Sequence, residues 1–228
     1  MWPEWTSPDG RIRLINADCL EVRYNLPEVD AVITDPPYGI NYKSSHQFSI
    51  DYGIISGDES DFDPSPWLDC DSVILWGGNN FANLLPIGGW ICWDKRLSED
   101  ADKILGSPFE LAWCSRRTLF RIVRLLHGGA KNADAKNGDV ANAARFHPTQ
   151  KPVRLMEACL DCFPKAETIL DPYAGSCSTA IACMRTNRRC ICIEKERKYW
   201  EIGIERVKKE LGRTVLFDRA EKQGMLIA

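Results

Sequence analysis

An acid, two prolines and an aromatic residue follow one another at Asp35-Pro36-Pro37-Tyr38. Because proline rings fix their φ angles, the Asp35 carboxylate and the carbonyl group of a following proline form a rigid pair of hydrogen-bond acceptors. Such a pair can accept both hydrogens of a planar exocyclic amine, and the ring of Tyr38 can stack on the base that carries it. Fixed acceptors help to free the delocalised lone pair of adenine or cytosine amines. They also stabilise the positive charge that develops as a methyl cation equivalent arrives.

A second motif lies in the C-terminal third, where Gly175 follows one expected strand and Glu194 ends the next, 19 positions later. At this spacing an acid bonds the ribose hydroxyls of an adenosine cofactor held over the first turn. The helix that begins near Ser178 would offer backbone amides to a carboxylate or a phosphate. Since a full GxGxxG is missing, a pyrophosphate dinucleotide fits poorly. The alternative for this second motif is a plain βαβ crossover that binds no cofactor. The alternative for the first motif is an ordinary turn that ends a strand at Asp35.

The elements that must position these motifs are short buried strands separated by helices. The expected strands cover residues 11–16, 30–34, 72–76, 90–93, 110–114, 168–171 and 190–193. The expected helices cover residues 152–163, 179–187 and 199–211, whereas 39–66 and 128–144 read as loops. Strands that alternate with helices indicate an α/β sandwich with a largely parallel sheet. In this arrangement Asp171 would end a strand, and Asp35 and Glu194 would each directly follow one.

The composition is typical of a globular chain, with 228 residues, 44% hydrophobic and 27% charged. It excludes a disordered protein, a collagen-like repeat and a coiled coil. No apolar run approaches the roughly 18 residues of a membrane span, and the N-terminus lacks the pattern of a secretory signal. We therefore expect a cytoplasmic protein with no membrane partner and with its ten cysteines reduced. Cys159 and Cys162 form a CxxC without a second pair at zinc spacing, so no metal site is expected.

Charge is strongly segregated along the chain, although the net charge is only −3. Residues 16–71 contain twelve acids against two bases, whereas residues 113–154 contain nine bases against two acids, a local excess of +7. Such segregation can mark a surface for a polyanion, and a solvated basic face without a ligand is the alternative. The candidate nucleic-acid-binding residues are Arg116, Arg117, Arg121, Arg124, Lys131, Lys136 and Arg145.

With these motifs in this order, the chain resembles the S-adenosylmethionine-dependent DNA methyltransferases that methylate adenine N6 or cytosine N4. The order matches the permuted β class, in which the catalytic motif precedes the cofactor motif. The resemblance spans residues 11–211. It implies a Rossmann-like α/β sandwich, with a mostly parallel, seven-stranded mixed sheet and helices on both faces. We expect one catalytic domain over residues 1–228, with a short basic target-recognition insert at about 116–146.

By that resemblance, Asp35, Pro36, Pro37 and Tyr38 form the catalytic motif, and Glu194 binds the ribose of S-adenosylmethionine. The Asp18 side chain and the Cys19 amide resemble an adenine-binding pair, while Thr149 and Lys151 would reach the carboxylate of the cofactor. The cofactor loop and the helix start after it would comprise Asp171, Tyr173, Ala174, Gly175, Ser176 and Ser178. The catalytic and cofactor strands are expected to be neighbours at the point where strand order reverses.

The chain departs from the family pattern at two positions of the cofactor loop. Tyr173 stands where a phenylalanine is usual, and Cys177 stands where a second glycine is usual, which would narrow the loop. The leading expectation is a site-specific transferase for the N6 amine of an adenine flipped out of duplex DNA. Cytosine N4, an RNA amine, or a non-catalytic nucleic-acid-binding subunit of the same fold are the alternatives. A homodimer and a cognate restriction nuclease stay open as partners.

Overall fold

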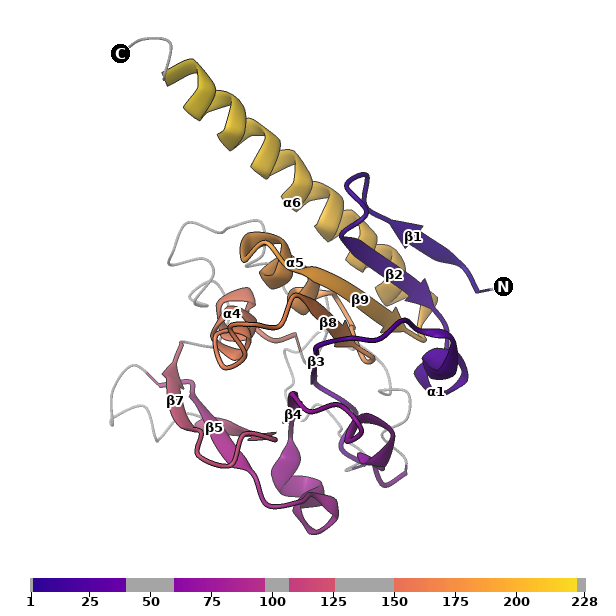
Figure 1. Ribbon diagram of the computed structural model, residues 1–228, viewed down its shortest axis with the longest axis vertical. Coiled ribbons are helices and arrows are strands. Elements are labelled where there is room, and N and C mark those ends of the chain that lie inside the picture. The colour runs from indigo at the N-terminus through magenta and orange to yellow at the C-terminus, as the bar shows by residue number, and fades with distance from the viewer. Residues whose placement is uncertain (1, 40–59, 97–106, 126–149, 225–228) are drawn as a thin grey trace, which may run out of the picture.

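The computed structural model describes residues 2–39, 60–96, 107–125 and 150–224, with only the backbone described for 214–224. A nine-stranded sheet runs through the described part in the order β1-β2-β9-β8-β3-β4-β6-β5-β7 (Figure 1). The strands are β1 (Glu4–Thr6), β2 (Ile12–Asn16), β3 (Ala31–Thr34), β4 (Val73–Trp76), β5 (Gly89–Asp94), β6 (Phe109–Cys114), β7 (Phe120–Arg124), β8 (Thr168–Asp171) and β9 (Arg189–Glu194).

All strands except β1 and β6 run in the same direction, so the sheet is mixed and mostly parallel, as expected. It has nine strands rather than seven. The two additional strands lie at the two edges, where local patterns are weak. Strand β1 has only three residues. In β7 the apolar side chains of Phe120 and Ile122 face solvent, so the segment, which the sequence places in the basic insert, has no buried apolar run.

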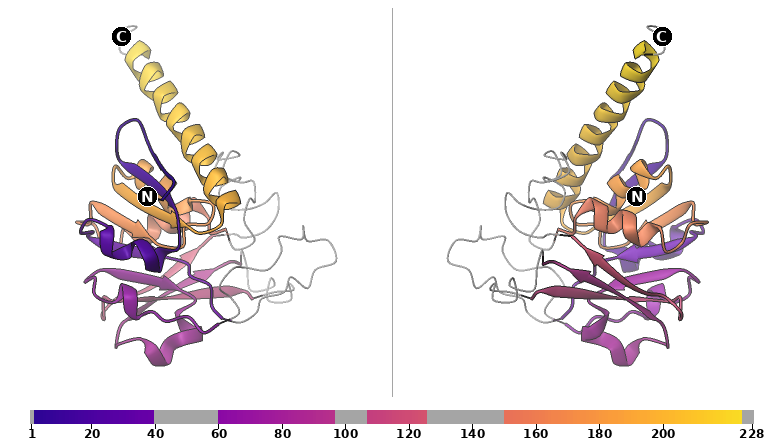
Figure 2. Two further views of the ribbon diagram at one scale, coloured as in Figure 1. Left: turned by 90° about the vertical axis from the view of Figure 1, so that its right-hand side faces the viewer. Right: turned by 90° about the vertical axis from the view of Figure 1, so that its left-hand side faces the viewer.

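Two hydrophobic clusters cover the two faces of the sheet, and Figure 2 shows how the helices lie against it. On one face pack the helices α4 (Val153–Leu160), α5 (Ser178–Arg185) and α6 (Arg197–Gly224). The other face is covered by α1 (Cys19–Val22) and the 3-10 helices η2 (Ser65–Trp67) and η3 (Gly78–Leu84). The 3-10 helix η1 (Arg23–Asn25) directly follows α1 and has no buried residue. The central strands β3 and β4 are buried at every position, as expected for parallel strands covered on both faces.

Helix α6 begins just after β9, packs on β2 and β9, and continues well beyond the edge of the sheet (Figures 1 and 2). Trp200, Ile204 and Val207 lie one turn apart and bury its N-terminal half. None of the helices in the described ranges is both long enough and apolar enough to cross a membrane.

Strand order reverses between β8 and β3, which pair directly in parallel. From β8 the chain passes through α5 to β9 on one side, and from β3 it proceeds to β4 on the other. Asp35 directly follows β3 and Asp171 ends β8, so both lie at the carboxyl edge of the sheet. In open α/β sheets ligands bind at such a switch point. The expectation that the two motif strands are neighbours is confirmed.

Candidate active site

The carboxylate of Asp35 lies just beyond β3 and accepts a hydrogen bond from the Tyr38 hydroxyl, with Oη and Oδ1 2.5 Å apart. The ring of Tyr38 packs against Gly77, directly after the end of β4. Gly77, with φ +70°, makes this approach feasible, because a Cβ atom there would lie 2.1 Å from the ring. The absence of a side chain at Gly77, directly after β4, therefore leaves the space that the Tyr38 ring occupies.

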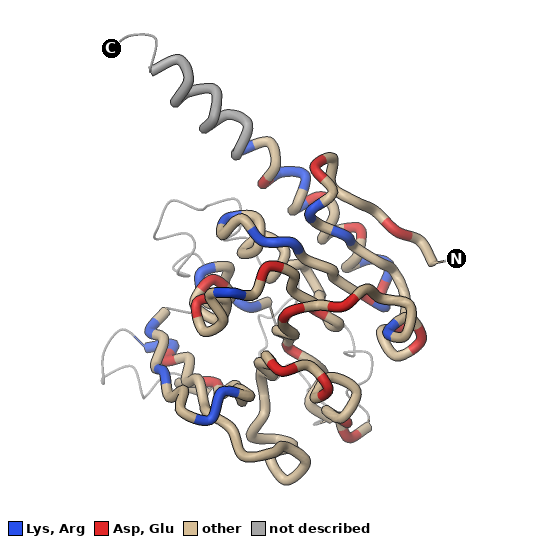
Figure 3. Tube along the Cα trace, in the orientation of Figure 1, with Lys and Arg blue, Asp and Glu red and all other residues tan. Residues whose placement is uncertain are grey.

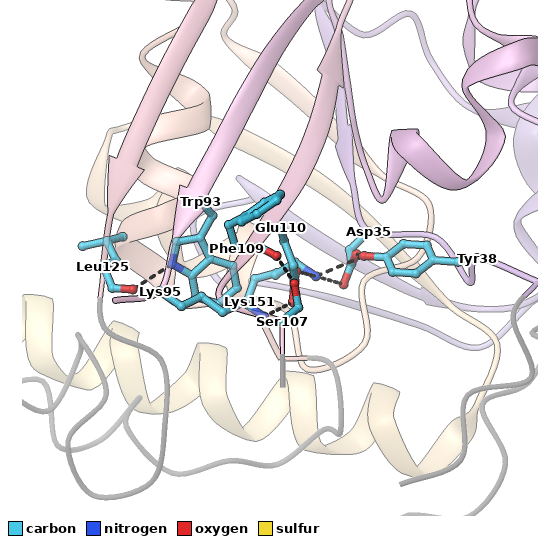
Figure 4. Close-up of polar contacts among 9 residues, drawn as sticks. All are labelled: Asp35, Tyr38, Trp93, Lys95, Ser107, Phe109, Glu110, Leu125 and Lys151. Carbon is cyan, nitrogen blue, oxygen red and sulfur yellow. Dashed lines mark hydrogen bonds and ion pairs between the residues drawn. The ribbon is translucent and has the colours of Figure 1, made fainter. Parts of the chain in front are cut away.

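The second oxygen of Asp35 is bound by Lys151, whose Nζ lies 2.6 Å from Oδ2. The same ammonium group lies 3.0 Å from Oε2 of Glu110, and Oε1 of Glu110 lies 2.5 Å from Nζ of Lys95 (Figure 4). Glu110 comes from β6, and Lys95 follows β5 with its ammonium group 5.0 Å from the centre of the Trp93 ring. The Asp35 carboxylate of the catalytic motif thus begins a row of four charges of alternating sign.

Burial raises the pKa of Asp35 above its ordinary value; the ammonium group of Lys151 opposes this rise, and the carboxylate of Glu110 adds to it. Burial would lower the pKa of Lys151, but the carboxylates of Asp35 and Glu110 outweigh it and raise that pKa. Burial alone would raise the pKa of Glu110, but the ammonium groups of Lys151 and Lys95 outweigh it and lower that pKa to about 2. Lys151 and Glu110 are therefore both charged near neutral pH.

At the cofactor motif, Glu194 ends β9 with both carboxylate oxygens turned toward backbone amides. Oε2 accepts from the Gly175 amide at 2.8 Å, and Oε1 accepts from the Glu196 amide at 2.7 Å. Burial raises the pKa of Glu194 to about 7. A carboxylate has about four lone-pair directions, so two remain for hydroxyl donors. This half-buried acceptor beside a glycine turn fits the ribose of S-adenosylmethionine.

Asp171 is buried, and it connects the two motif strands. Its Oδ1 accepts from the Thr34 hydroxyl at 2.6 Å and from the Tyr173 amide at 3.3 Å. Burial raises its pKa to about 7. The ring of Tyr173, which stands where a phenylalanine is usual, packs edge-on against Phe62 and Trp67. Asp171 therefore fixes the loop to β3, and its neighbour Ala174 is also buried.

The expected adenine-binding pair lies at the carboxyl edge, where α1 begins. Asp18 caps this helix by accepting from the Leu20 amide at 3.0 Å, and it pairs with Lys195 at 3.0 Å. Cys19 is buried, and burial raises its pKa to about 11. Because β2 pairs with β9, Asp18 and Glu194 follow or end neighbouring strands, as an adenosine group spanning both would require.

Arg206, which sequence reasoning missed, anchors the cofactor loop from α6. Its guanidinium group donates to the Ser176 carbonyl oxygen, to the Ser176 hydroxyl at 2.8 Å and to the Ser178 hydroxyl at 3.5 Å. The Ser176 hydroxyl in turn donates to Gln150 at 3.1 Å. Arg206 is only 5% exposed. A lone arginine in a charged helix gives no local signal of this role.

Cys177 adopts a left-handed conformation with φ 62°, which explains why glycine is usual at this position. Its buried side chain packs against α6 at Gly203, where an added Cβ would lie 2.4 Å from the Cys177 sulfur. The added bulk is thus accommodated by a glycine in the helix.

The structure places the ammonium group of Lys151 between Asp35 and Glu110. This geometry favours a role at the catalytic motif. The expected contact of Lys151 with the carboxylate of the cofactor stays a prediction. Glu110 and Lys95 were missed because a single acid in an apolar strand and a lysine after a strand are common features of solvent-facing positions. The other expected carboxylate ligand, Thr149, lies outside the described residues.

The basic residues that follow β6 and the one that ends β7 do not form one patch, because they lie toward opposite ends of the strands (Figure 3). Since β6 runs antiparallel to β4, Arg116 and Arg117 lie at the amino edge, opposite Asp35. Arg116 and Arg121 donate to carbonyl groups at the end of α4, at 3.3 and 2.8 Å. Arg124 lies at the carboxyl edge and pairs with Asp94 at 3.5 Å. Lys131, Lys136 and Arg145 lie outside the described residues.

Comparison with known proteins gives a consistent result. A family model described as DNA methylase, covering N6 and N4 methyltransferases, matches residues 90–205. YubD of Escherichia coli (strain K12), named as a methylase, is 26% identical over 86% of this chain and 89% of its own. The type II methyltransferase M2.DpnII of Streptococcus pneumoniae is 24% identical over 88% of this chain and 91% of its own.

Among solved structures, the M1.HpyAVI–SAM complex is similar with a TM-score of 0.57 at 20% identity. The match covers 86% of this chain and 98% of that chain. At this identity the likeness concerns the fold, and it agrees with the Rossmann-like sheet and switch point described above.

Proposed function

Because the chain belongs to the family of DNA methylases that use S-adenosylmethionine to methylate adenine N6 or cytosine N4, we propose that it methylates the N6 amine of adenine in duplex DNA at specific sites. The observation that carries the proposal is the placement of Asp35 beside the cofactor loop, across the junction of β3 and β8. A target amine at Asp35 would adjoin a cofactor held between Gly175 and Glu194.

In this mechanism S-adenosylmethionine supplies a methyl group attached to a positively charged sulfur. Glu194 would accept hydrogen bonds from the ribose, and Asp18 with the Cys19 amide would face the adenine of the cofactor. Ser176 and Ser178, held by Arg206, shape the loop around it. These contacts orient the donor without contributing charge to the reacting nitrogen.

The acceptor base would leave the duplex and stack on Tyr38, since an amine within the helix cannot reach a recessed carboxylate. Its amine would replace the Tyr38 hydroxyl at Oδ1 of Asp35, because Lys151 already occupies Oδ2. The second hydrogen would be accepted by a proline carbonyl of the motif. As the nitrogen lone pair forms the new bond to the methyl carbon, the carbon–sulfur bond of the donor would break and leave a neutral thioether. Asp35 would stabilise the positive charge that develops on the nitrogen, which then loses one proton to solvent.

The test is transfer of a labelled methyl group to duplex DNA, single-stranded DNA and RNA, followed by nucleoside mass spectrometry. The duplex is made by amplification, so that it carries no methyl groups. Asp35→Ala is expected to reduce transfer by about 10²-fold or more while S-adenosylmethionine still binds. Asp69→Ala, which changes an exposed acid before β4, serves as the control.

N6-methyladenine in the duplex that disappears with Asp35→Ala supports the proposal. If the product is N4-methylcytosine, or if label appears in RNA alone, the proposed acceptor is wrong, but the proposed role of Asp35 still holds. Equal loss of cofactor binding and transfer in Asp35→Ala contradicts that role.

A further inference from the structure

The charges behind Asp35 form a chain from four separate segments. Lys95 follows β5, Glu110 lies in β6, Lys151 precedes α4 and Asp35 follows β3. Successive nitrogen–oxygen distances are 2.5, 3.0 and 2.6 Å, and the side chains of Lys95, Lys151 and Asp35 are at most 15% exposed (Figure 4). Partly buried charges are costly unless paired, and here each carboxylate meets at least one ammonium group.

Three polar groups surround the ammonium group of Lys151, which donates hydrogen bonds to Asp35 and Tyr38 and forms an ion pair with Glu110. Its nitrogen lies 2.6 Å from Asp35, 3.0 Å from Glu110 and 3.4 Å from the Tyr38 hydroxyl. The rings of Trp76 and Tyr38 adjoin the same ammonium group, at 5.6 and 6.0 Å from their centres. Lys151 thus occupies one Asp35 oxygen, and the other accepts from the Tyr38 hydroxyl, which an incoming amine would replace.

We propose that Glu110 is a positioning residue for methyl transfer, which holds the Lys151 ammonium group between two carboxylates and so keeps Asp35 a strong acceptor for the target amine. This role rests on the proposed function of Asp35. Glu110 competes for Lys151, and Lys95 fixes the other oxygen of Glu110 so that its carboxylate cannot rotate away. Without Glu110, the positive charge of Lys151 would act on Asp35 alone.

Replacement of Glu110 by glutamine keeps its shape and removes its charge. The amide could accept from one lysine, but its NH2 group would face the other. Lys151 would then draw electron density from Asp35 without competition, and Asp35 would become a weaker acceptor. The groups that face Asp35 in the described residues are Tyr38, Lys151 and Glu110. Loss of the Glu110 charge leaves Lys151 dominant among them, so the pKa of Asp35 should fall.

The experiment measures single-turnover methyl transfer at saturating cofactor and DNA, as a function of pH, for wild type, Glu110→Gln and Glu110→Asp. Glu110→Gln is expected to lower the rate constant by about 10- to 100-fold, to change cofactor affinity less than twofold, and to move the acidic midpoint of the profile to lower pH. Glu110→Asp retains the charge and is expected to keep the wild-type midpoint. Glu157→Gln is the matched control, because Glu157 is 27% exposed against 29% for Glu110 and is also paired, with Arg185.

A second measurement does not depend on activity. The Asp35 carboxyl carbon, labelled with ¹³C and assigned by comparison with Asp35→Asn, is followed by NMR through a pH titration. A lower titration midpoint in Glu110→Gln than in wild type is expected. An unchanged midpoint, or a rate loss matched by equal losses of cofactor affinity and thermal stability, overturns the positioning role. A wild-type protein that binds cofactor but methylates no acceptor contradicts the proposed function instead, while the NMR shift still reports on Glu110.

Discussion

Two features of Glu194 have opposite effects on its pKa. Its carboxylate accepts hydrogen bonds from two backbone amides, which favours the charged form and lowers the pKa. Its burial outweighs these bonds and raises the pKa to about 7 from an ordinary value of 4.5. Ribose hydroxyls donate to an ionised carboxylate more strongly than to a protonated one. The charge state of this one group should therefore control how tightly the cofactor binds near neutral pH.

We expect the affinity for S-adenosylmethionine to fall as the pH is lowered from 8 to 6, because Glu194 gains a proton as the pH passes through its raised pKa of about 7. If only the ionised form binds, the loss at pH 6 is about tenfold. Isothermal titration calorimetry in buffers of different ionisation enthalpy measures both the affinity and the protons released on binding at pH 7.

Glu194→Gln should bind more weakly at pH 8 and should lose this pH dependence. Asp171, with its pKa also raised to about 7, still titrates in this variant. Residual pH dependence would therefore assign the effect to Asp171, and a flat wild-type profile would contradict the prediction.

At the scale of elements, α6 stabilises the cofactor loop from behind. Arg206 binds the loop through the backbone and hydroxyl of Ser176, and Gly203 leaves space for the side chain of Cys177. The glycine of the helix therefore compensates for the cysteine in the loop.

Gly203→Ala is expected to destabilise the protein by about 1–3 kcal/mol, since the new methyl group would lie 2.4 Å from the Cys177 sulfur. Gly212→Ala in the same helix is the matched control, because nothing lies within 4 Å of its added Cβ. Alanine has the higher helix propensity, so the control should gain about 1 kcal/mol. Urea unfolding measures both, and equal effects would contradict the steric account. Cys177→Gly in the Gly203→Ala background should restore stability.

At the scale of the whole molecule, charges that are clustered in sequence are separated in space. Arg117 and Arg124 are seven positions apart and both are exposed, yet they lie at opposite edges of the sheet, because β6 reverses direction and β7 returns. Only the carboxyl edge carries Asp35 and the cofactor motif. A DNA duplex bound there could contact Arg124, whereas Arg117 would face away from it.

Arg124→Ala is therefore expected to weaken DNA binding similarly for all sequences and to reduce the slope of log K against log salt by about 1. Arg117→Ala, a change of the same charge at the opposite edge, should leave both unchanged. Fluorescence anisotropy with a labelled duplex between 50 and 200 mM salt measures the two slopes. Equal losses of DNA affinity in the two variants would contradict this, because DNA would then contact both ends of the strands.

The motifs and most of the sheet could be read from local sequence, because each depends on neighbouring residues. Buried strands such as β3 and β4 show as β-branched runs, and Asp35 and Glu194 are recognisable because they directly follow or end such runs. The order of β3 and β8 followed from the resemblance and is confirmed. The edge strands β1 and β7 were not predicted, since neither shows an apolar run that faces a core.

Tertiary structure alone decided which charges meet. Glu110 reaches Lys151 because the antiparallel strand β6 brings its first residues to the carboxyl edge, beside a lysine that is 41 positions away along the chain. The same reversal carries Arg116 and Arg117 to the opposite edge. Sequence patterns determine which residues end strands and helices, since those depend on local conformational preference. Strand direction and pairing determine which ends share an edge, and the balance between burial and ion pairing then sets the charge at Asp35.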